Sequence, residues 1–303
     1  MRPLLHIGYH KTGSTFLQRR VFPEPGFSLV ARSKVLRPAF VECDPFAFDA
    51  RAAREALRPG IDKAREDGLV PVLSAERLSG NPHSGGYDSR QTAERLAAAF
   101  PEARVLVVIR EQAQMLVSAY KQYVKRGGPG TLRQYATPAS EERRVPLFDF
   151  RFFEYHRLVG FYRGLFGAED VMVLPYELLR ADPGAFLGRI GAFAGAKARA
   201  SDPEPVKVSP SALSLSLVRR ANRWVVRSDL NPAPPFEREG ADRALVRLSL
   251  RADEKLPAAW RARAERALLA EAEGLAEGLY AESNDATSEL AGLDLGKFGY
   301  ARG

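Results

Sequence analysis

Short continuous apolar runs alternate with amphipathic stretches over the first two thirds of the chain. The runs are Leu4–Ile7, Val70–Leu73, Arg104–Ile109 and Val171–Leu174, and the run ending at Ile109 is the strongest. A strand that is apolar at every position fits a parallel sheet covered on both faces. The alternation of such strands with helices predicts an α/β fold, in which a central parallel sheet is flanked by helices through right-handed crossovers.

Helices are expected in the amphipathic stretches between these strands. Their expected bounds are 50–67, 89–100, from just after 110 to about 125, 151–166 and 183–194. Residues 127–147 are expected to form a loop, since they open on Gly-Gly-Pro-Gly. We expect one domain over 1–303. Its core reaches about 225, a Pro-rich connection covers about 229–238, and a helical C-terminal extension over about 240–303 includes an amphipathic helix at 257–282.

Composition narrows the class of protein. The chain has 303 residues, of which 45% are hydrophobic, and this excludes a disordered chain. The single cysteine, Cys43, cannot form an internal disulfide, and no Cys/His cluster has zinc-like spacing. The formal net charge of +8 favours an anionic partner, although part of the arginine excess fits the codon bias of a GC-rich genome.

The N-terminal pattern and the length of the apolar runs bear on location. The first apolar run stops at Gly8, whereas the apolar region of a signal peptide needs about 7–15 residues. No run approaches the ~20 apolar residues of a membrane span. We therefore expect a cytoplasmic protein without a membrane span.

The first loop carries the first chemical signal. A strand, the segment Tyr9–Thr15 and a helix follow one another, and such a turn directs backbone N–H groups and the helix dipole at one point. Lys11 adds a mobile positive charge, and Thr12, Ser14 and Thr15 add hydroxyl donors. The lysine precedes the glycine, so the segment is not a Walker A loop. It is typical of a phosphate or sulfate site, and the alternative is an ordinary turn with a surface lysine.

The segment Lys11–Phe16, Lys-Thr-Gly-Ser-Thr-Phe, resembles the 5′-phosphosulfate loop of sulfotransferases that use 3′-phosphoadenosine 5′-phosphosulfate (PAPS). The family pattern is P-K-[ST]-G-[ST]-[ST], and His10 stands here in place of the proline. The resemblance implies a P-loop-NTPase-like sulfotransferase fold, PAPS as donor, 3′-phosphoadenosine 5′-phosphate (PAP) as product, and no metal. It implies that Lys11, Gly13 and the three hydroxyl residues bind the donor.

A second motif has the order that the family requires. Arg110 follows the strongest strand and Ser118 lies eight positions later, which resembles the family's R-x-P…S-x-Y pattern without its proline. In the family these two residues bind the 3′-phosphate. The position and chemistry of Arg110 also favour phosphate binding. Open parallel sheets bind ligands beyond the carboxyl ends of their strands, and a guanidinium makes forked contacts to phosphate. The alternative is an arginine that caps a strand and a serine that faces solvent.

Three further residues are candidates for donor contacts. Residues 171–183 are similar to a family strand followed by Y-E-[DE]-L-x-x-D-P, which implies that Tyr176 contacts the adenine. Phe16 occupies a position where some relatives stack an aromatic ring on adenine. Lys207 is a candidate for closing the 3′-phosphate site. The alternatives are core packing for the two aromatic residues and a solvated surface position for Lys207.

Sulfuryl transfer is an in-line displacement that needs a cation at the leaving oxygen and a base for the acceptor. Lys11 is the candidate cation. Glu76 ends the strand that starts at Val70 and is the favoured base, as in several carbohydrate sulfotransferases; alternatively it pairs with an arginine such as Arg77 or Arg110. His10 is a rival base, and so is His83, which lies in the Gly-rich segment 80–86 that we expect to be flexible. The other two histidines, His6 and His156, are expected in the core.

A kinase and a nucleic-acid-binding protein are the alternative functions. A kinase on a related scaffold would need Walker A spacing, and a nucleic-acid-binding protein would need clustered basic residues. Basic and acidic residues are instead interspersed, as in Arg261–Arg266, so no nucleic-acid partner is expected. The expected acceptor is a bacterial cell-surface glycan precursor, a glycolipid or a small metabolite. Segments 80–88 and 127–150 are expected to shape its site; the basic residues of the second are Arg133, Arg143 and Arg144, just after Lys125 and Arg126.

Overall fold

The computed structural model describes residues 1–138, 146–201, 210–227 and 231–303, and in it the chain packs as two compact units. Unit 1 comprises Met1–Glu111, Arg151–Glu204 and Tyr280–Gly303. Unit 2 comprises Gln112–Phe150 and Pro205–Leu279. The expected single domain over 1–303 stays a prediction.

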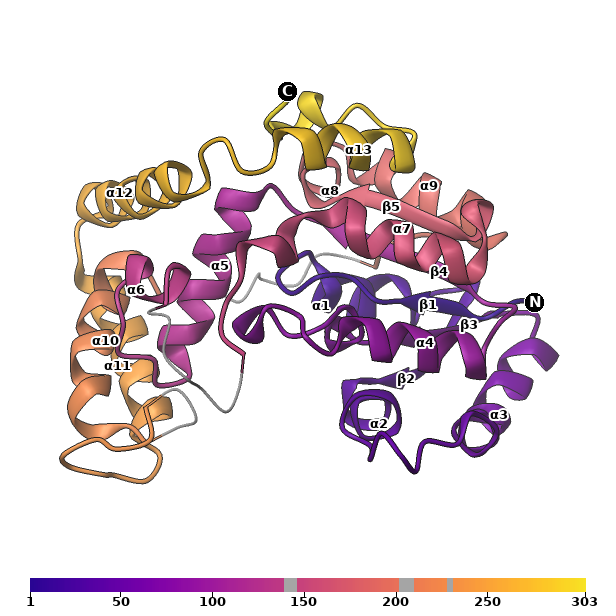
Figure 1. Ribbon diagram of the computed structural model, residues 1–303, viewed down its shortest axis with the longest axis horizontal. Helices are drawn as coiled ribbons and strands as arrows, with labels where there is room; N and C mark the ends of the chain where they lie inside the picture. The colour runs from indigo at the N-terminus through magenta and orange to yellow at the C-terminus, as the bar shows by residue number, and fades with distance from the viewer. Residues whose placement is uncertain (139–145, 202–209, 228–230) are drawn as a thin grey trace. The chain divides into compact units, whose positions relative to one another are not determined.

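The core of unit 1 is a five-stranded sheet with the order β2-β3-β1-β4-β5 (Figure 1). All four strand pairs are parallel, as the sequence predicts. The strands are β1 (Leu4–His6), β2 (Phe27–Arg32), β3 (Val70–Ser74), β4 (Arg104–Ile109) and β5 (Val171–Pro175). Because the strands are parallel, their carboxyl ends meet at one edge of the sheet, and the loops after β1, β3, β4 and β5 all leave from that edge.

Helices cover both faces of this sheet. The helices α3, α4 and α7 pack on one face, and α1 with its continuation η1, together with α9, packs on the other (Figure 1). The elements of unit 1 are α1 (Ser14–Phe16), η1 (Leu17–Val21), α2 (Ser33–Leu36), η2 (Arg37–Val41), α3 (Ala50–Glu66), η3 (Glu76–Ser79), η4 (Pro82–Ser84), α4 (Ser89–Ala99), α7 (Tyr155–Phe166), η6 (Ala168–Asp170), α8 (Tyr176–Ala181), α9 (Pro183–Ala194), α13 (Ala281–Ala291) and η7 (Leu295–Phe298).

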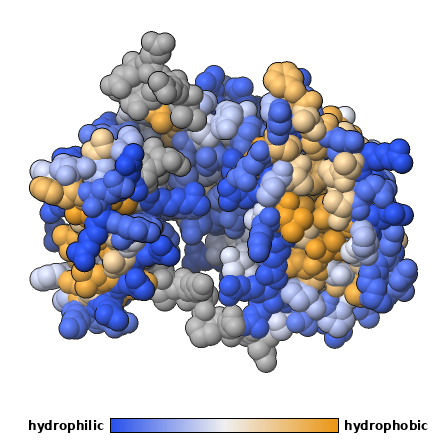
Figure 2. All heavy atoms as spheres, turned by 90° about the horizontal axis from the view of Figure 1, so that it is seen from below, coloured by the Kyte–Doolittle hydropathy of each residue, from blue (hydrophilic) through white to orange (hydrophobic). Residues whose placement is uncertain are grey.

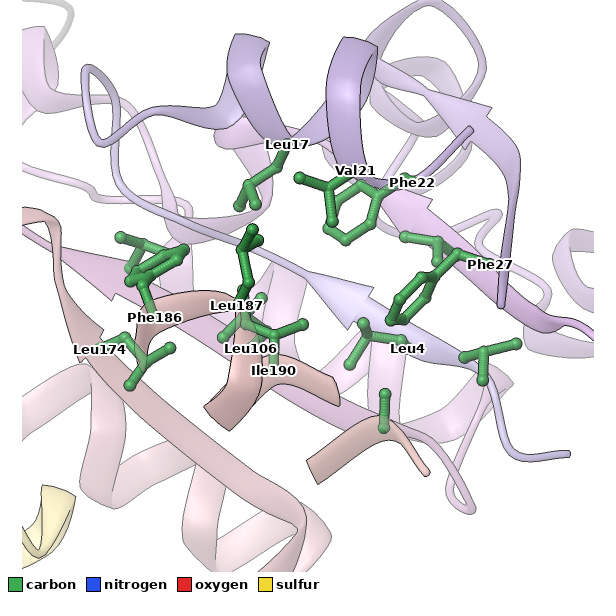
Figure 3. Close-up of a cluster of buried hydrophobic side chains, with 14 of the residues drawn as sticks. Leu4, Leu17, Val21, Phe22, Phe27, Leu106, Leu174, Phe186, Leu187 and Ile190 are labelled. Carbon is green, nitrogen blue, oxygen red and sulfur yellow. The ribbon is translucent and has the colours of Figure 1, made fainter. Parts of the chain in front are cut away.

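Alternate strand residues bury against each helix layer, because successive side chains of a strand point to opposite faces. Leu4, Leu106 and Leu174 join the cluster under η1 and α9, which Figure 3 shows with Leu17 and Phe186. The residues next to them in each strand are buried toward the other helix layer. Examples are Leu5, Val105, Val107 and Val173. Burial on both faces accounts for the continuous apolar character of these strands.

Local signals set the ends of several helices. α9 begins after Asp182, whose carboxylate accepts the N–H of Ala185 at 2.8 Å, and Pro183 occupies its first position. It ends at Gly195, which has a left-handed backbone with φ of 76°. These bounds are the predicted ones. The helices predicted over 50–67 and 89–100 are confirmed within two residues.

Unit 2 is helical. It contains α5 (Gln112–Lys125), α6 (Leu132–Ala136), α10 (Ala212–Val225), α11 (Ala241–Lys255) and α12 (Ala258–Ala276); a short turn, η5 (Phe150–Phe153), links it back to unit 1. Helix α10 packs against α5, α11 and α12. The Asn222 amide of α10 donates to the carbonyls of Val124 and Gly128, and Lys121 of α5 pairs with Glu265 of α12 at 2.6 Å. These contacts join residues that are 94 to 144 positions apart in sequence.

The structure corrects several expected elements. The predicted loop over 127–147 contains α6, which begins in a capping box formed by Thr131 and Gln134. The predicted helix over 257–282 is broken after Ala276, where Gly278 has φ of 72°, and the chain resumes as α13. The predicted helix over 151–166 starts instead as η5. Strand β2 and helix α10 were not predicted, and α11 lies in the predicted helical extension, although its bounds were not predicted.

Strand β2 lies at the edge of the sheet. A hollow along it is lined by apolar residues including Phe27, Leu29, Val30 and Leu69, and Figure 2 shows hydrophobic side chains gathered on this part of unit 1. The hollow shares no residue with the motifs at the strand ends. Within the described ranges, every helix is too short or too polar to cross a membrane.

Candidate donor site at the strand ends

The loop after β1 is held on the sheet and turns sharply. The N–H groups of Ile7 and Tyr9 continue the pairing with β4, each at 3.1 Å from a carbonyl oxygen. Lys11 then has φ of 67° and Gly13 has φ of 86°, so two left-handed residues flank Thr12. Such alternation curls backbone N–H groups toward one side, an arrangement typical of anion sites. Lys11 is the one non-glycine residue with positive φ among the described residues, a conformation that costs about 1–2 kcal/mol.

The hydroxyls of the loop differ in their surroundings. Thr12 is buried and its Oγ1 donates to the carbonyl of Tyr9 at 2.6 Å, so this hydroxyl braces the loop. Ser14 is 2% exposed, and its Oγ has no hydrogen-bond partner among the described residues. Thr15 is exposed. A buried hydroxyl without a partner is costly, so Ser14 fits a loop that completes its hydrogen bonds with a ligand.

Arg110 and Tyr176 lie beside this loop. The Arg110 guanidinium donates to the carbonyl of Lys11 at 3.3 Å and stacks over the Tyr176 ring at 5.3 Å from its centroid. Tyr176 packs on Gly13, because a Cβ added there would lie 3.1 Å from the ring and 3.0 Å from Leu179. The left-handed backbone and this close approach both favour glycine. The structure thus brings Lys11, Gly13, Arg110 and Tyr176 together, from the ends of β1, β4 and β5.

The backbone around Arg110 is fixed by two buried contacts. The Tyr155 hydroxyl donates to the carbonyl of Arg110 at 2.5 Å, and the N–H of Glu111 donates to Glu177 Oε1 at 3.1 Å. Burial raises the pKa of the Glu177 carboxyl above its usual value, although hydrogen bonds to it oppose the rise. Sequence reasoning missed both residues: Tyr155 belongs to none of the quoted motifs, and Glu177 is the glutamate of the Y-E-[DE]-L-x-x-D-P pattern but was given no role.

The candidate base lies at the same edge. Glu76 is the first residue of η3, directly after β3, and the N–H of the preceding Ala75 donates to the carbonyl of His6. Since β3 is the neighbour of β1, the end of β3 and the loop carrying Lys11 are adjacent. The Arg77 guanidinium lies 2.7 Å from Asp88, and the alternative pairing of Glu76 with Arg77 or Arg110 stays a prediction.

The histidines occupy different environments. His10 is 8% exposed and follows Tyr9 in the loop. His83 is 9% exposed and lies in η4; its segment was expected to be flexible but is closely packed. A Cβ on Gly86 would lie 2.2 Å from Phe152, and one on Gly80 would lie 2.1 Å from Ser89 Oγ.

The two histidines expected in the core have side-chain partners. His6 is fully buried, and burial lowers its pKa to about 3. His6 Nδ1 lies 2.7 Å from Ser74 Oγ. His156 Nδ1 lies 2.8 Å from Ser283 Oγ. This side chain is partly buried, and its burial lowers the pKa of His156 below the usual value.

The remaining candidates are placed as follows. Phe16 is half-buried and packs on the core cluster below the loop. Ser118 is half-buried on α5, in unit 2, and its pairing with Arg110 stays a prediction. Lys207, Arg143 and Arg144 lie outside the described residues. Across the described ranges, no group of three or more His, Cys, Asp or Glu residues could hold a metal ion.

Comparison with known proteins points to one family. Residues 88–199 match the model of the Sulfotransferase family. The structure is similar to that of a sulfotransferase from Alicyclobacillus acidocaldarius, with 18% identity, a TM-score of 0.54 and 99% of each chain covered. It also matches a sulfotransferase domain from the curacin biosynthetic pathway, with 14% identity, a TM-score of 0.34 and 68% and 76% of the two chains covered. No curated protein matches the sequence.

The family match includes Arg110 and Tyr176, and the whole fold is shared with a sulfotransferase structure. The resemblance indicated by the sequence motifs is therefore confirmed: residues 88–199 match the model of the Sulfotransferase family, and the chain shares the fold of a sulfotransferase structure over its length.

Proposed function

We propose that this protein transfers the sulfuryl group of PAPS to a hydroxyl or amine of an acceptor and releases PAP. One observation carries the proposal. The loop of Lys11 and Gly13 lies against Arg110 and Tyr176 at the carboxyl ends of the strands, which is where open parallel sheets bind ligands. The family match over residues 88–199 supports the same activity.

The residues of the site suit a phosphosulfate. Ser14 supplies a buried hydroxyl without an internal partner, and the left-handed residues Lys11 and Gly13 curl the backbone N–H groups around an anion. Arg110 is proposed to hold the 3′-phosphate, because its guanidinium can donate two parallel hydrogen bonds. Tyr176 offers a ring for the adenine. Thr12, Thr15, Phe16, Ser118 and Lys207 complete the proposed set.

Two side chains, Lys11 and Glu76, carry out the proposed chemistry on the bound donor and the acceptor. The bound donor supplies the sulfuryl group. The Lys11 ammonium stabilises the negative charge that develops on the leaving phosphate oxygen, and it acts with the backbone N–H groups of the loop. Glu76 accepts the proton of the attacking hydroxyl or amine. His10 and His83 remain rival bases. No step in this scheme calls for a metal ion.

The donor site is tested by binding. Isothermal titration should show that PAP binds at least about tenfold more tightly than ATP. Arg110→Ala should weaken PAP binding by about 10–100-fold, because a charge-assisted hydrogen bond is lost. Arg104→Ala is the matched control, since Arg104 begins the same strand at its opposite end. An unchanged PAP affinity in Arg110→Ala would rule out this donor site.

The base is tested by turnover. Sulfuryl transfer from labelled PAPS should be measured with a panel of glycans, glycolipids and small hydroxylated or amino compounds, which are the proposed acceptors. Glu76→Gln should lower kcat by about 10²–10⁴-fold while PAP affinity is retained. Full turnover in this variant would remove Glu76 as the base, and parallel His10→Asn and His83→Asn variants test its rivals. The cytoplasmic location stays a prediction.

A further inference from the structure

The C-terminal segment 280–303 returns to the back of the candidate donor site. Tyr300 is 3% exposed, and its hydroxyl donates to Glu177 Oε2 at 3.1 Å. The other oxygen of that carboxylate accepts the N–H of Glu111. Glu177 directly follows Tyr176, and Glu111 directly follows Arg110. One carboxylate therefore joins the ends of β4 and β5, and Tyr300 holds its second oxygen.

The segment that carries Tyr300 is itself anchored. The Tyr300 N–H donates to the carbonyl of Leu295 at 3.4 Å, and the Asn284 amide donates to the carbonyl of Ala301 at 3.0 Å. Arg302 pairs with Asp285 and Asp294. Helix α13 packs on α7 and β5. The phenol is thus presented from an ordered element, at a distance of 123 residues in sequence from its partner.

The link matters because Glu177 is a buried carboxylate. Burial raises the pKa of the Tyr300 phenol well above its usual value, so the phenol stays a hydrogen-bond donor. Removal of the donor leaves one buried carboxylate oxygen short of a partner, which favours protonation or rotation of the group. Either change weakens the bond to Glu111 N–H, and with it the position of the backbone that carries Arg110.

We propose that Tyr300 is a positioning residue of the donor site, which acts through Glu177 on Arg110 and thereby on recognition of the 3′-phosphate. The inference rests on the proposed function for its ligand. It assigns a role to the C-terminal segment, which the sequence motifs leave without one. In this scheme Tyr300 acts through Glu177 and has no role at the reacting atoms.

The main test compares two ligands that differ only in the 3′-phosphate. The affinity of PAP and of adenosine 5′-monophosphate should be measured for the wild type and for Tyr300→Phe. The preference for PAP should fall by about three- to tenfold in the variant, because the position of Arg110 is loosened. Tyr162→Phe is the control: it also removes a fully buried phenol hydroxyl, which bonds to the carbonyl of Leu78. An unchanged preference in Tyr300→Phe overturns the proposal.

A double-variant cycle tests the route through Glu177. Tyr300→Phe should change the preference little in a Glu177→Gln background, because the carboxylate through which it acts is gone. The same loss in both backgrounds would show that Tyr300 acts by another route and would overturn the proposal.

Amide hydrogen exchange separates this inference from the donor assignment. The Glu111 amide should exchange faster in Tyr300→Phe than in wild type or Tyr162→Phe, whatever ligand the site binds. Wild-type protein that binds no PAP while this amide responds would contradict the proposed function alone. Unchanged exchange at Glu111 would contradict the positioning role of Tyr300.

Discussion

At the scale of single residues, His6 shows how the end of β1 is fixed. The Gln18 amide donates to Ser74 Oγ at 2.9 Å, so the serine hydroxyl is left to donate to His6 Nδ1. The proton of the neutral ring then lies on Nε2, which has no hydrogen-bond partner among the described residues. A Cβ on Gly8 would lie 2.8 Å from Nε2, so this position requires glycine.

The buried neutral His6 predicts a pH dependence of stability. Its pKa falls from 6.5 to about 3 on folding, so below pH 6.5 the unfolded chain binds a proton that the folded chain does not. The free energy of unfolding should therefore decrease as the pH falls, by up to about 1.4 kcal/mol per pH unit from this group. The free energy of unfolding, measured by denaturant titration at several pH values between 6.5 and 4, should fall more steeply with decreasing pH for wild type than for His6→Gln. Equal slopes would contradict the assignment.

At the same scale, the sequence predicted the grouping of Lys11, Gly13, Arg110 and Tyr176. Each belongs to a strand end, and the parallel topology brings strand ends together. Glu177 and Tyr300 could not be predicted in this way. Their contact spans 123 residues, and nothing in either local pattern identifies the other partner.

At the scale of elements, continuous apolar strands and capped helices were predictable. β4 and α9 have the predicted bounds because their signals are local. β2 was not predicted from the sequence because it is an edge strand. It has three half-buried positions and an irregular register between Leu29 and Ala31. α6 was not predicted, although Thr131 and Gln134 have the spacing of a capping box in the sequence. α10 and α11 depend on contacts with each other and with α5.

One buried carboxylate joins α10 and α11. Asp253 accepts the N–H of Ser211 at 2.6 Å and the hydroxyls of Ser211 and Ser214 at 2.5 and 2.6 Å. Burial alone would raise the pKa of Asp253, but these hydrogen bonds outweigh it and hold the pKa below its usual value. Their contribution is present above the unfolded pKa, near 3.8, and is lost as the pH falls through the lower folded value.

Asp253→Ala should lower the free energy of unfolding by about 2–3 kcal/mol at neutral pH, because buried donors of α10 lose their acceptor. Chemical denaturation followed by circular dichroism measures this loss. Glu254→Ala, at the exposed neighbouring position, should change it by less than about 0.5 kcal/mol. A loss no larger than that of the control would show that the cluster does not hold the two helices.

At the scale of the whole molecule, the chain leaves unit 1 after Glu111 and returns to it twice. The last return places Tyr280, Leu295 and Tyr300 in buried positions, and Arg163 of α7 donates to the carbonyl of Leu290 at 2.6 Å. Within the expected extension over 240–303, α11 and α12 belong to unit 2 and α13 belongs to unit 1. Composition could not show this, because both parts are similarly polar helices.

Removal of residues 280–303 should therefore destabilise unit 1. Loss of several buried side chains should lower the midpoint of thermal unfolding by at least about 10 °C. Removal of Arg302 and Gly303 alone, both exposed, is the control and should lower it by only a few degrees, since Ala301 keeps its hydrogen bond to Asn284. Equal midpoints for the wild type and the longer truncation would show that the segment adds nothing to the fold.

The left-handed conformation of Lys11 sets folding against activity at one position. Glycine there would relieve the backbone of about 1–2 kcal/mol and would be the better choice for stability. It would also remove the ammonium on which the proposed transfer depends. Selection of variants for thermal stability alone would therefore accept Lys11→Gly, and the same selection carried out with a requirement for turnover would reject it.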